Sequence, residues 1–218
     1  IYMYYANATE VSVSDNALIS AYSSIYSASG FPTINIKDKA KLKATHFAIY
    51  AGISKNLKIS ISGDPVISAS GISKFQPVFP EGKCAIRLED CQGELDISGG
   101  TVSVDPPDDT GIPTYGIRAT HSHKVYEGMN INVSGNAMIN AEEDNAASYG
   151  IMCEMVPSNI MISDNAKIYG EQLGISVTYP GIAYSNSISF AVSGICVIEG
   201  GIRLDLIAPE RLLKTDIS

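Results

Sequence analysis

The sequence has no tryptophan, and its basic residues are few: 15 lysines and arginines stand against 23 aspartates and glutamates in 218 residues. The net charge is therefore −8 at pH 7, and no segment gathers basic residues beside aromatic ones. An acidic chain without a basic patch repels the phosphates of DNA and RNA, so we expect no nucleic-acid partner. Apolar residues make up 45% of the chain, which excludes intrinsic disorder.

Long hydrophobic runs are also absent. Serine, glycine, asparagine or a charged residue interrupts every apolar stretch before it reaches the roughly 18 to 20 residues that cross a bilayer. We therefore expect no membrane span in this segment. Helix-forming composition is scarce as well, since 29 isoleucines and 26 serines accompany only 10 leucines. This balance favours strands and turns over helices, which excludes coiled coils and helical bundles and predicts an all-β chain.

The cysteines show neither a CxxC pair nor a histidine at the spacing of zinc ligands, so no metal site is expected from them. They are Cys84, Cys91, Cys153 and Cys196. We expect free, mostly buried thiols that behave as small apolar residues. A disulfide between Cys84 and Cys91 is the alternative.

One motif recurs seven times and organises the chain. Its template, INVSGNAMINA, covers residues 131–141. The other copies lie at residues 11–21, 34–44, 59–69, 95–104, 160–170 and 190–199. Each copy alternates apolar and polar residues on both sides of a polar turn, which is the pattern of two short strands joined by a tight bend. The residue before the turn recurs at intervals of 23 to 36 residues, at Ser14, Lys37, Ser62, Ser98, Ser134, Ser163 and Ser193.

A second element, glycine followed by isoleucine in an apolar setting, lies between the copies and predicts a third short strand in each repeat. It occurs at residues 50–53, 115–117, 149–151, 173–175 and 201–202, with Ala85-Ile86 as a variant. A unit of three short strands cannot close a core alone. Stacked units can, because each strand pairs with its counterpart in the next unit and the inward isoleucines form columns.

This arrangement resembles the right-handed parallel β-helix of the pectin-lyase-like superfamily. The phrase ISGGTV at residues 97–102 and its relative VSGNA at residues 133–137 are similar to repeats in surface and secreted proteins of gut Gram-positive bacteria, many of them adhesin-like or carbohydrate-binding. The resemblance covers residues 9–207 by repeat pattern. It implies a single-stranded right-handed parallel β-helix, a solenoid of about seven rungs, in an extracellular or cell-surface setting. A β-sandwich or jelly roll is the competing fold, but neither predicts a motif that recurs in phase.

We expect one solenoid domain over residues 1–218, standing alone or as a segment of a longer surface protein. Residues 1–8 and 208–218 depart from the repeat and are expected to be terminal or capping segments, because an open solenoid end exposes unpaired backbone. Residues 1–5 would add a first strand or part of a cap. Residues 208–214 would form a short helical turn.

Three insertions, at residues 70–83, 105–114 and 142–148, follow successive copies of the motif. In a solenoid they should lie above one another on one edge, and long turns of this kind are where ligands bind. Two of them are acidic, through Asp105, Asp108 and Asp109 in one and Glu142, Glu143 and Asp144 in the next. Stacked carboxylates favour Ca²⁺ or an acid/base pair on a glycosidic bond. The alternative is a solvated acidic turn, because no DxDxDG calcium loop is present.

Tyr115 and Tyr149 each precede a Gly-Ile pair, so we expect them to stack beside the acidic insertions. Aromatic faces next to carboxylates commonly bind sugars. The alternative is a pair of core or edge tyrosines anchored by their hydroxyls. Together with the six acidic residues, these two tyrosines form the predicted ligand site, and its partner would be a glycan or a host or cell-surface polysaccharide.

Two further groups of residues carry weaker patterns. The opposite turn holds basic and aromatic side chains that would suit a metal or a lyase base, although a polar loop is the alternative and no third metal ligand is evident. These are Arg118, His121, His123, Lys124 and Tyr126. Asn16, Asn136 and Asn165 share a turn position, where we expect left-handed backbone and bonds between stacked amides.

The sequence thus predicts a non-enzymatic secreted or cell-surface protein with a structural, adhesive or glycan-binding role. The alternative is a carbohydrate-active enzyme, a polysaccharide lyase or glycoside hydrolase, that works at the acidic edge. The chain contains no phosphate-binding glycine loop and no GxSxG nucleophile motif, so no cofactor is expected apart from Ca²⁺ at the acidic insertions. No residue is assigned a catalytic role.

Overall fold

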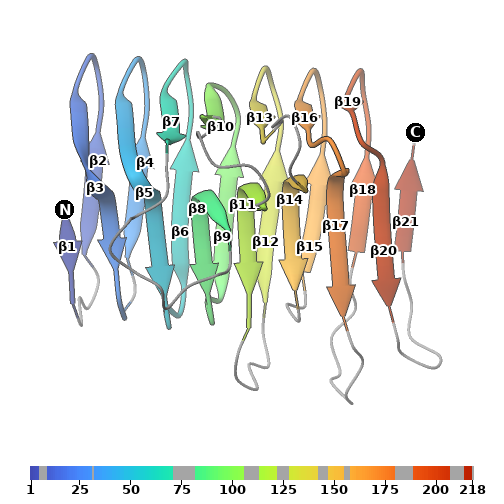
Figure 1. Cartoon of the computed structure of the whole chain (residues 1–218), viewed down its shortest axis with the longest axis horizontal. Coiled ribbons are helices and arrows are strands. Elements are labelled where there is room, and N and C mark those ends of the chain that lie inside the picture. The colour runs from blue at the N-terminus through green and yellow to red at the C-terminus, as the bar shows by residue number, and fades with distance from the viewer. Residues whose placement is uncertain are drawn as a thin grey trace.

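The computed structural model describes residues 1–4, 9–30, 32–70, 82–105, 113–121, 128–141, 147–154, 158–179, 189–206 and 214–217. These residues contain strands β1 to β21, all paired in parallel, and no helix (Figure 1). The predicted all-β class is confirmed. Over the same residues, nothing helical is long or apolar enough to span a membrane.

An eight-stranded sheet holds the first strand of each copy of the motif. Its strands, in order, are β2 (Glu10–Val13), β4 (Thr33–Ile36), β6 (Leu57–Ile61), β9 (Gly93–Ile97), β12 (Met129–Val133), β15 (Ser158–Ile162), β18 (Ser189–Val192) and β21 (Lys214–Ile217). Each strand therefore pairs with its counterpart in the next repeat rather than with its neighbour in sequence.

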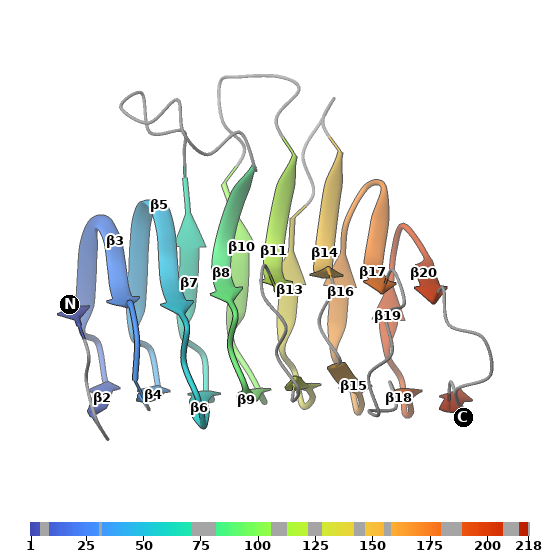
Figure 2. The ribbon, with the colours of Figure 1, turned by 90° about the horizontal axis from the view of Figure 1, so that it is seen from below.

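The thirteen-stranded sheet has two tiers, joined by the long strands β3 (Leu18–Ser27) and β5 (Lys41–Gly52), which belong to both (Figure 2). One tier, which we call the short-strand tier, continues with β7 (Val66–Ala69), β10 (Thr101–Val104), β13 (Met138–Asn140), β16 (Lys167–Tyr169) and β19 (Val197–Ile198). The other, the Gly-Ile tier, contains β1 (Tyr2–Met3), β8 (Lys83–Glu89), β11 (Thr114–Thr120), β14 (Ser148–Glu154), β17 (Leu173–Tyr179) and β20 (Ile202–Leu206).

The register confirms that the copies of the motif stack in phase. In the eight-stranded sheet, the first apolar residues of the copies are successive Cα partners: Val11, Ile34, Ile59, Leu95, Ile131, Ile160 and Phe190. The Gly-Ile tier has its own column, formed by Ile25, Ile49, Ile86, Ile117, Ile151, Ile175 and Ile202. All but the last of these are completely buried. The predicted third strand is thus present, and isoleucine columns form the core.

One Gly-Ile assignment is wrong. In the phrase at residues 50–53, Ile53 lies beyond the end of β5, is 68% exposed and has a φ of 51°. Ile49 fills the column position instead, as the Cα partner of Ile86. Strand β5 continues into the Gly-Ile tier without an insertion, so the residue that enters the isoleucine column is Ile49, four residues before Ile53.

The turns between the two sheets also correct a prediction. The left-handed residue is an aspartate or glycine one position before the predicted asparagine, as at Asp15, Asp164 and Gly135, with φ values of 58°, 62° and 61°. At Gly135, an added Cβ would lie 2.2 Å from the Ser98 carbonyl oxygen of the neighbouring repeat. The expected amide contact is confirmed, since Asn165 Nδ2 donates to Asn136 Oδ1 at 3.4 Å.

At the ends of the chain, two strands extend the sheets. β1 pairs with β3, as expected for a first strand, and β21 pairs with β18 and adds an eighth strand to its sheet. Of the predicted helical turn at residues 208–214, only Lys214 is described, and it lies in β21. The rest of that turn lies outside the described residues.

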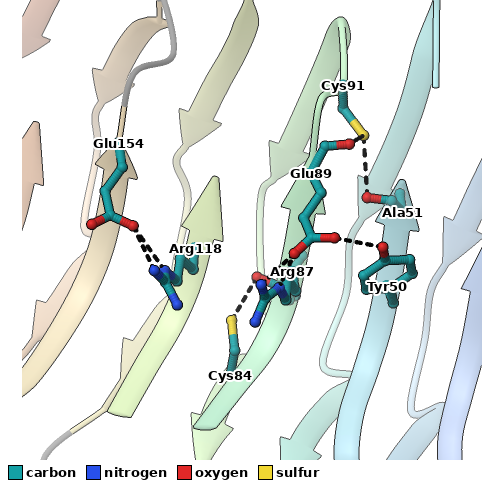
Figure 3. A network of polar contacts seen from close by, with 9 residues as sticks. Tyr50, Ala51, Cys84, Arg87, Glu89, Cys91, Arg118 and Glu154 are labelled. Carbon is teal, nitrogen blue, oxygen red and sulfur yellow. Dashed lines mark hydrogen bonds and ion pairs between the residues drawn. The ribbon is translucent and has the colours of Figure 1, made fainter. Parts of the chain in front are cut away.

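The four cysteines are free, and Cys84, Cys91 and Cys153 are buried as expected. The alternative Cys84–Cys91 disulfide is not formed. Burial raises the pKa of the Cys84 and Cys91 thiols to about 12, so both stay protonated at neutral pH. Their sulfurs donate to backbone oxygens, Cys84 to Ile86 and Cys91 to Ala51 (Figure 3).

Truncation of the buried isoleucine column tests the stacked core. Ile117→Ala removes a fully buried side chain and leaves a cavity, so we expect a loss of about 2 to 5 kcal/mol in unfolding free energy, measured by urea denaturation. The matched control is Ile195→Ala, at a side chain that is 80% exposed, for which we expect a change within about 0.5 kcal/mol. Similar losses in the two variants would contradict the assignment of the column to the core.

Candidate functional site

The outward side of the Gly-Ile tier carries a cluster of aromatic residues near the start of the chain. Strand β3 contributes Tyr22 and Tyr26, and β5 contributes His46 and Tyr50. Because pairing is parallel and in register, Tyr26 lies between Tyr2 of β1 and Tyr50 of β5. Side chains at partner positions of neighbouring strands lie close enough to interact, so the rings stack across the sheet.

Two stacks of rings result. Tyr26 and Tyr50 are nearly parallel, with ring centroids 4.6 Å apart and an interplanar angle of 11°, and Tyr2 lies 5.4 Å from Tyr26 on the other side. In the second stack, Tyr22 and His46 lie 5.1 Å apart at 27°. Offset or tilted stacking of this kind adds stability beyond the burial of ring area.

Both stacks line one cavity of about 160 Å³. Its lining combines aromatic faces, one serine and a charged pair, and consists of Tyr2, Tyr22, Ser23, Tyr26, His46, Phe47, Tyr50, Arg87 and Glu89. A largely aromatic wall with a few polar groups is the usual composition of a small-molecule site. This cavity is therefore the candidate functional site.

Three of the polar groups of the cavity, Tyr50, Arg87 and Glu89, form a connected network (Figure 3). Tyr50 donates its hydroxyl hydrogen to Glu89 Oε2 at 2.6 Å, and Arg87 Nε donates to Glu89 Oε1 at 2.7 Å. A second guanidinium nitrogen of Arg87 also contacts Glu89 Oε1. The guanidinium lies 5.4 Å from the centroid of the Phe47 ring, within cation–π range. Arg87 is thus held between a ring face and a carboxylate.

Burial sets the charge of the titratable rings in the cavity. Desolvation, followed by the nearby Arg87 charge, lowers the pKa of His46 to about 4. Desolvation and the hydrogen bond to Glu89 raise the pKa of Tyr50, and desolvation is also the main cause that raises the pKa of Tyr26. The imidazole and both phenols are therefore uncharged at neutral pH.

The predicted tyrosine pair lies further along the same tier. Tyr115 and Tyr149 are Cα partners, and their rings stack at 5.4 Å and 13°, as expected. Tyr115 is buried, and desolvation is the main cause that raises its pKa to about 12. Tyr149 is only half-buried and donates its hydroxyl hydrogen to Gln172 Oε1 at 2.8 Å. Of the two rings, Tyr149 is the more accessible.

The acidic part of the predicted site is described only at its border. Asp105 is exposed, and its N–H donates to the Ala69 carbonyl oxygen at 2.9 Å. At the other end of the insertions, the backbone N–H of Lys83 donates to the Pro113 carbonyl oxygen, and the backbone N–H of Thr114 donates to the Ala147 carbonyl oxygen. The three insertions therefore leave and rejoin the sheet on neighbouring strands of one edge. Asp108, Asp109, Glu142, Glu143 and Asp144 lie outside the described residues.

Ca²⁺ binding at the acidic edge stays a prediction. Within the described ranges, no three histidine, cysteine, aspartate or glutamate side chains are grouped closely enough to hold a metal ion. Most of the acidic residues on which the calcium prediction rests are outside those ranges.

The residues assigned to the opposite turn are also described in part. Arg118 lies within strand β11 and not in a turn, so its assignment to the turn is wrong. It pairs with Glu154, its Nε donating to Glu154 Oε2 at 3.0 Å, and its guanidinium lies 4.8 Å from the centroid of the Tyr115 ring. His121 is buried, and its Nδ1 lies 3.3 Å from Asp90 Oδ1. Desolvation lowers the pKa of His121 despite this carboxylate. His123, Lys124 and Tyr126 lie outside the described residues, so a His-x-His metal pair stays untested.

Sequence reasoning missed the aromatic cavity, although a signal for it exists. Tyr22 and Tyr26 are four residues apart, as are His46 and Tyr50, and the two pairs are separated by 24 residues. This separation is one residue longer than the first repeat interval, and the difference corresponds to the irregularity in the pairing of β3 with β5 after Ala21. Stacked aromatic rows can therefore be anticipated once repeats are aligned on their outward positions as well as their inward ones.

The chain matches no known family model, and the search of curated proteins and the search of solved structures also give no match.

The buried imidazole predicts a pH dependence of stability. The pKa of His46 is about 4 in the folded chain and about 6.5 when unfolded, so folding favours the neutral ring. The resulting stability is complete above about pH 6.5 and is lost as the pH falls towards 4. We expect His46→Phe, which keeps an aromatic ring, to reduce the drop in urea midpoint between about pH 7 and pH 4.5. The pKa of His121 is also lowered, so His121 adds to the loss of stability at low pH in both the wild-type protein and the His46→Phe variant. An identical drop in urea midpoint in the two proteins would therefore contradict the prediction for His46.

Proposed function

We propose that the chain is a single-stranded right-handed parallel β-helix, as in the pectin-lyase-like superfamily, and that it binds a glycan in the aromatic cavity. Each strand pairs in parallel with its counterpart in a neighbouring repeat, which supports the fold. The repeats from β6 onward supply three strands each, and in the first two repeats one long strand, β3 or β5, takes the place of two. Crossover connections between parallel strands are right-handed in nearly all proteins, which supports the hand.

The aromatic cavity is the single observation that carries the glycan proposal. A sugar ring presents apolar C–H faces and a rim of hydroxyls, so it needs flat apolar walls and hydrogen-bonding groups together. The aromatic rings that line the cavity, Tyr26 and Tyr50 among them, supply apolar surface, and Glu89 supplies an acceptor at one side. Because the rings are already stacked, little side-chain entropy is lost on binding.

A setting outside the cell or at its surface is part of the proposal, as is an adhesive or structural role for the stacked sheets. The state of Cys84 and Cys91 is compatible with an oxidising environment. Cys84 and Cys91 are buried thiols with raised pKa values, and a buried, protonated thiol is poorly reactive towards oxidants and disulfides.

The second candidate function is a polysaccharide lyase or glycoside hydrolase at the acidic edge. The stacked flanks of the three insertions and the accessible Tyr149 ring favour it. A glycosidase would need two carboxylates about 5 to 10 Å apart across the sugar bond, one of them with a raised pKa. Asp108 and Glu143 are the side chains whose replacement tests this edge.

A glycan and polysaccharide panel tests the proposed function, scored for retention of the protein and for release of reducing or unsaturated ends. We expect retention without product. Tyr26→Ala removes one wall of the cavity and should weaken binding about tenfold, since an aromatic contact contributes up to about 1.5 kcal/mol. The matched control, Tyr149→Ala, removes a stacked tyrosine of the same tier outside the cavity and should leave retention unchanged.

Three other outcomes would redirect the assignment. Retention that survives Tyr26→Ala but is lost in Tyr149→Ala, Asp108→Ala or Glu143→Ala would move the site to the acidic edge. Product formation would favour the enzyme. Absence of both retention and product would overturn the glycan proposal and leave a structural role.

A further inference from the structure

Among the described residues that line the aromatic cavity, the formal charges cancel at neutral pH. Arg87 and Glu89 are the two charged side chains in this described lining, and they are joined through both a guanidinium Nε and a terminal nitrogen. His46, Tyr26 and Tyr50 are neutral for the reasons given above. The side chain of Arg87 is only 3% exposed, so its charge is balanced locally by Glu89 rather than by water.

Glu89 keeps the capacity to bind a hydroxyl group. Oε1 accepts from two nitrogens of Arg87 and Oε2 accepts from Tyr50, whereas an ionised carboxylate has about four lone-pair sites in all. The side chain is 27% exposed. Hydrogen bonds from neutral hydroxyls to a carboxylate are charge-assisted and stronger than those between neutral groups. One hydroxyl of a sugar is a suitable donor for the remaining site, on Oε2.

A carboxylate on the ligand would bind unfavourably in this cavity. It would enter a cavity walled by aromatic rings, where water is displaced, and would lie beside the negative charge of Glu89. Arg87 carries one positive charge, so whether it paired with the ligand, with Glu89 or with both, it could balance only one of the two carboxylates. The second negative charge would be desolvated without a cation. Removing one partner from such a pair is strongly unfavourable.

From this charge arrangement we propose that the cavity binds an uncharged sugar residue and rejects uronic acids, and that Glu89 is the residue that determines this selectivity. The inference rests on the proposed glycan function and deepens it. The selectivity follows from the permanent pairing of Arg87, which in the absence of Glu89 would attract an acidic sugar.

The neighbouring strands provide a matched control pair. Arg118 of β11 is the Cα partner of Arg87 and forms the same kind of ion pair, with Glu154 of β14 (Figure 3). Glu154 does not line the cavity. Glu154→Gln therefore changes the overall charge of the protein as Glu89→Gln does, but not the charge of the cavity.

The experiment compares neutral oligosaccharides with the uronic acid oligomers of the same stereochemistry: glucose with glucuronate, galactose with galacturonate, and mannose with mannuronate. With the wild-type protein we expect the neutral member of at least one pair to bind and its uronate to bind at least tenfold more weakly. Neutral binding should change little with added salt. Glu89→Gln should weaken the neutral ligand about tenfold and strengthen the uronate, reversing the preference, whereas Glu154→Gln should preserve it.

The outcomes separate the two proposals. Equal or tighter binding of uronates by the wild-type protein would overturn the selectivity while upholding glycan binding. Absence of binding to every member of the three pairs and to the wider panel would overturn both. An unchanged preference in a folded Glu89→Gln variant, checked by its urea midpoint, would remove Glu89 as the determinant. The wild-type comparison decides the selectivity even if that variant fails to fold.

Discussion

Parallel, in-register pairing between successive repeats is the constraint on which the rest of this structure depends. Each strand bonds to its counterpart one repeat away, so residues at the same position of the motif form columns. Where a column points inward, isoleucine meets isoleucine, as at Ile117 and Ile151. Where it points outward near the start of the chain, ring meets ring, as at Tyr26 and Tyr50. The core and the candidate site are products of the same pairing.

The pairing also explains the charged part of the cavity. The column that contains Tyr26 and Tyr50 continues with Arg87 and Arg118, so two positively charged side chains follow the tyrosines on the next two strands. Each cation has its own glutamate, and each guanidinium lies over an aromatic ring. Partly buried ion pairs contribute little net stability because desolvation offsets their attraction. Their more informative property is that each glutamate balances the charge of its arginine, and the selectivity that we propose for the cavity depends on this balance.

The sequence predicted the columns because inward positions follow a simple alternation that insertions in the turns do not disturb. It predicted the Tyr115–Tyr149 stack because both residues precede the same Gly-Ile pair. It placed the left-handed turn residue one position too late, since asparagine and aspartate both tolerate that backbone and only the structure distinguishes Asp164 from Asn165. It missed the cavity because β3 and β5 run without interruption through both tiers, and the phase of their outward residues depends on an irregularity that composition does not reveal.

The chemistry of the cavity supports binding more than catalysis. General acid/base catalysis at neutral pH works best with groups whose pKa lies near the working pH. The neutral His46, with a pKa of about 4, is a weak base, and the raised pKa values of Tyr26 and Tyr50 keep their protons in place. Glu89 is occupied by Arg87 and Tyr50. Fixed rings and a carboxylate with one remaining acceptor site are suited to recognising a ligand by shape and hydrogen bonding rather than to transferring a proton.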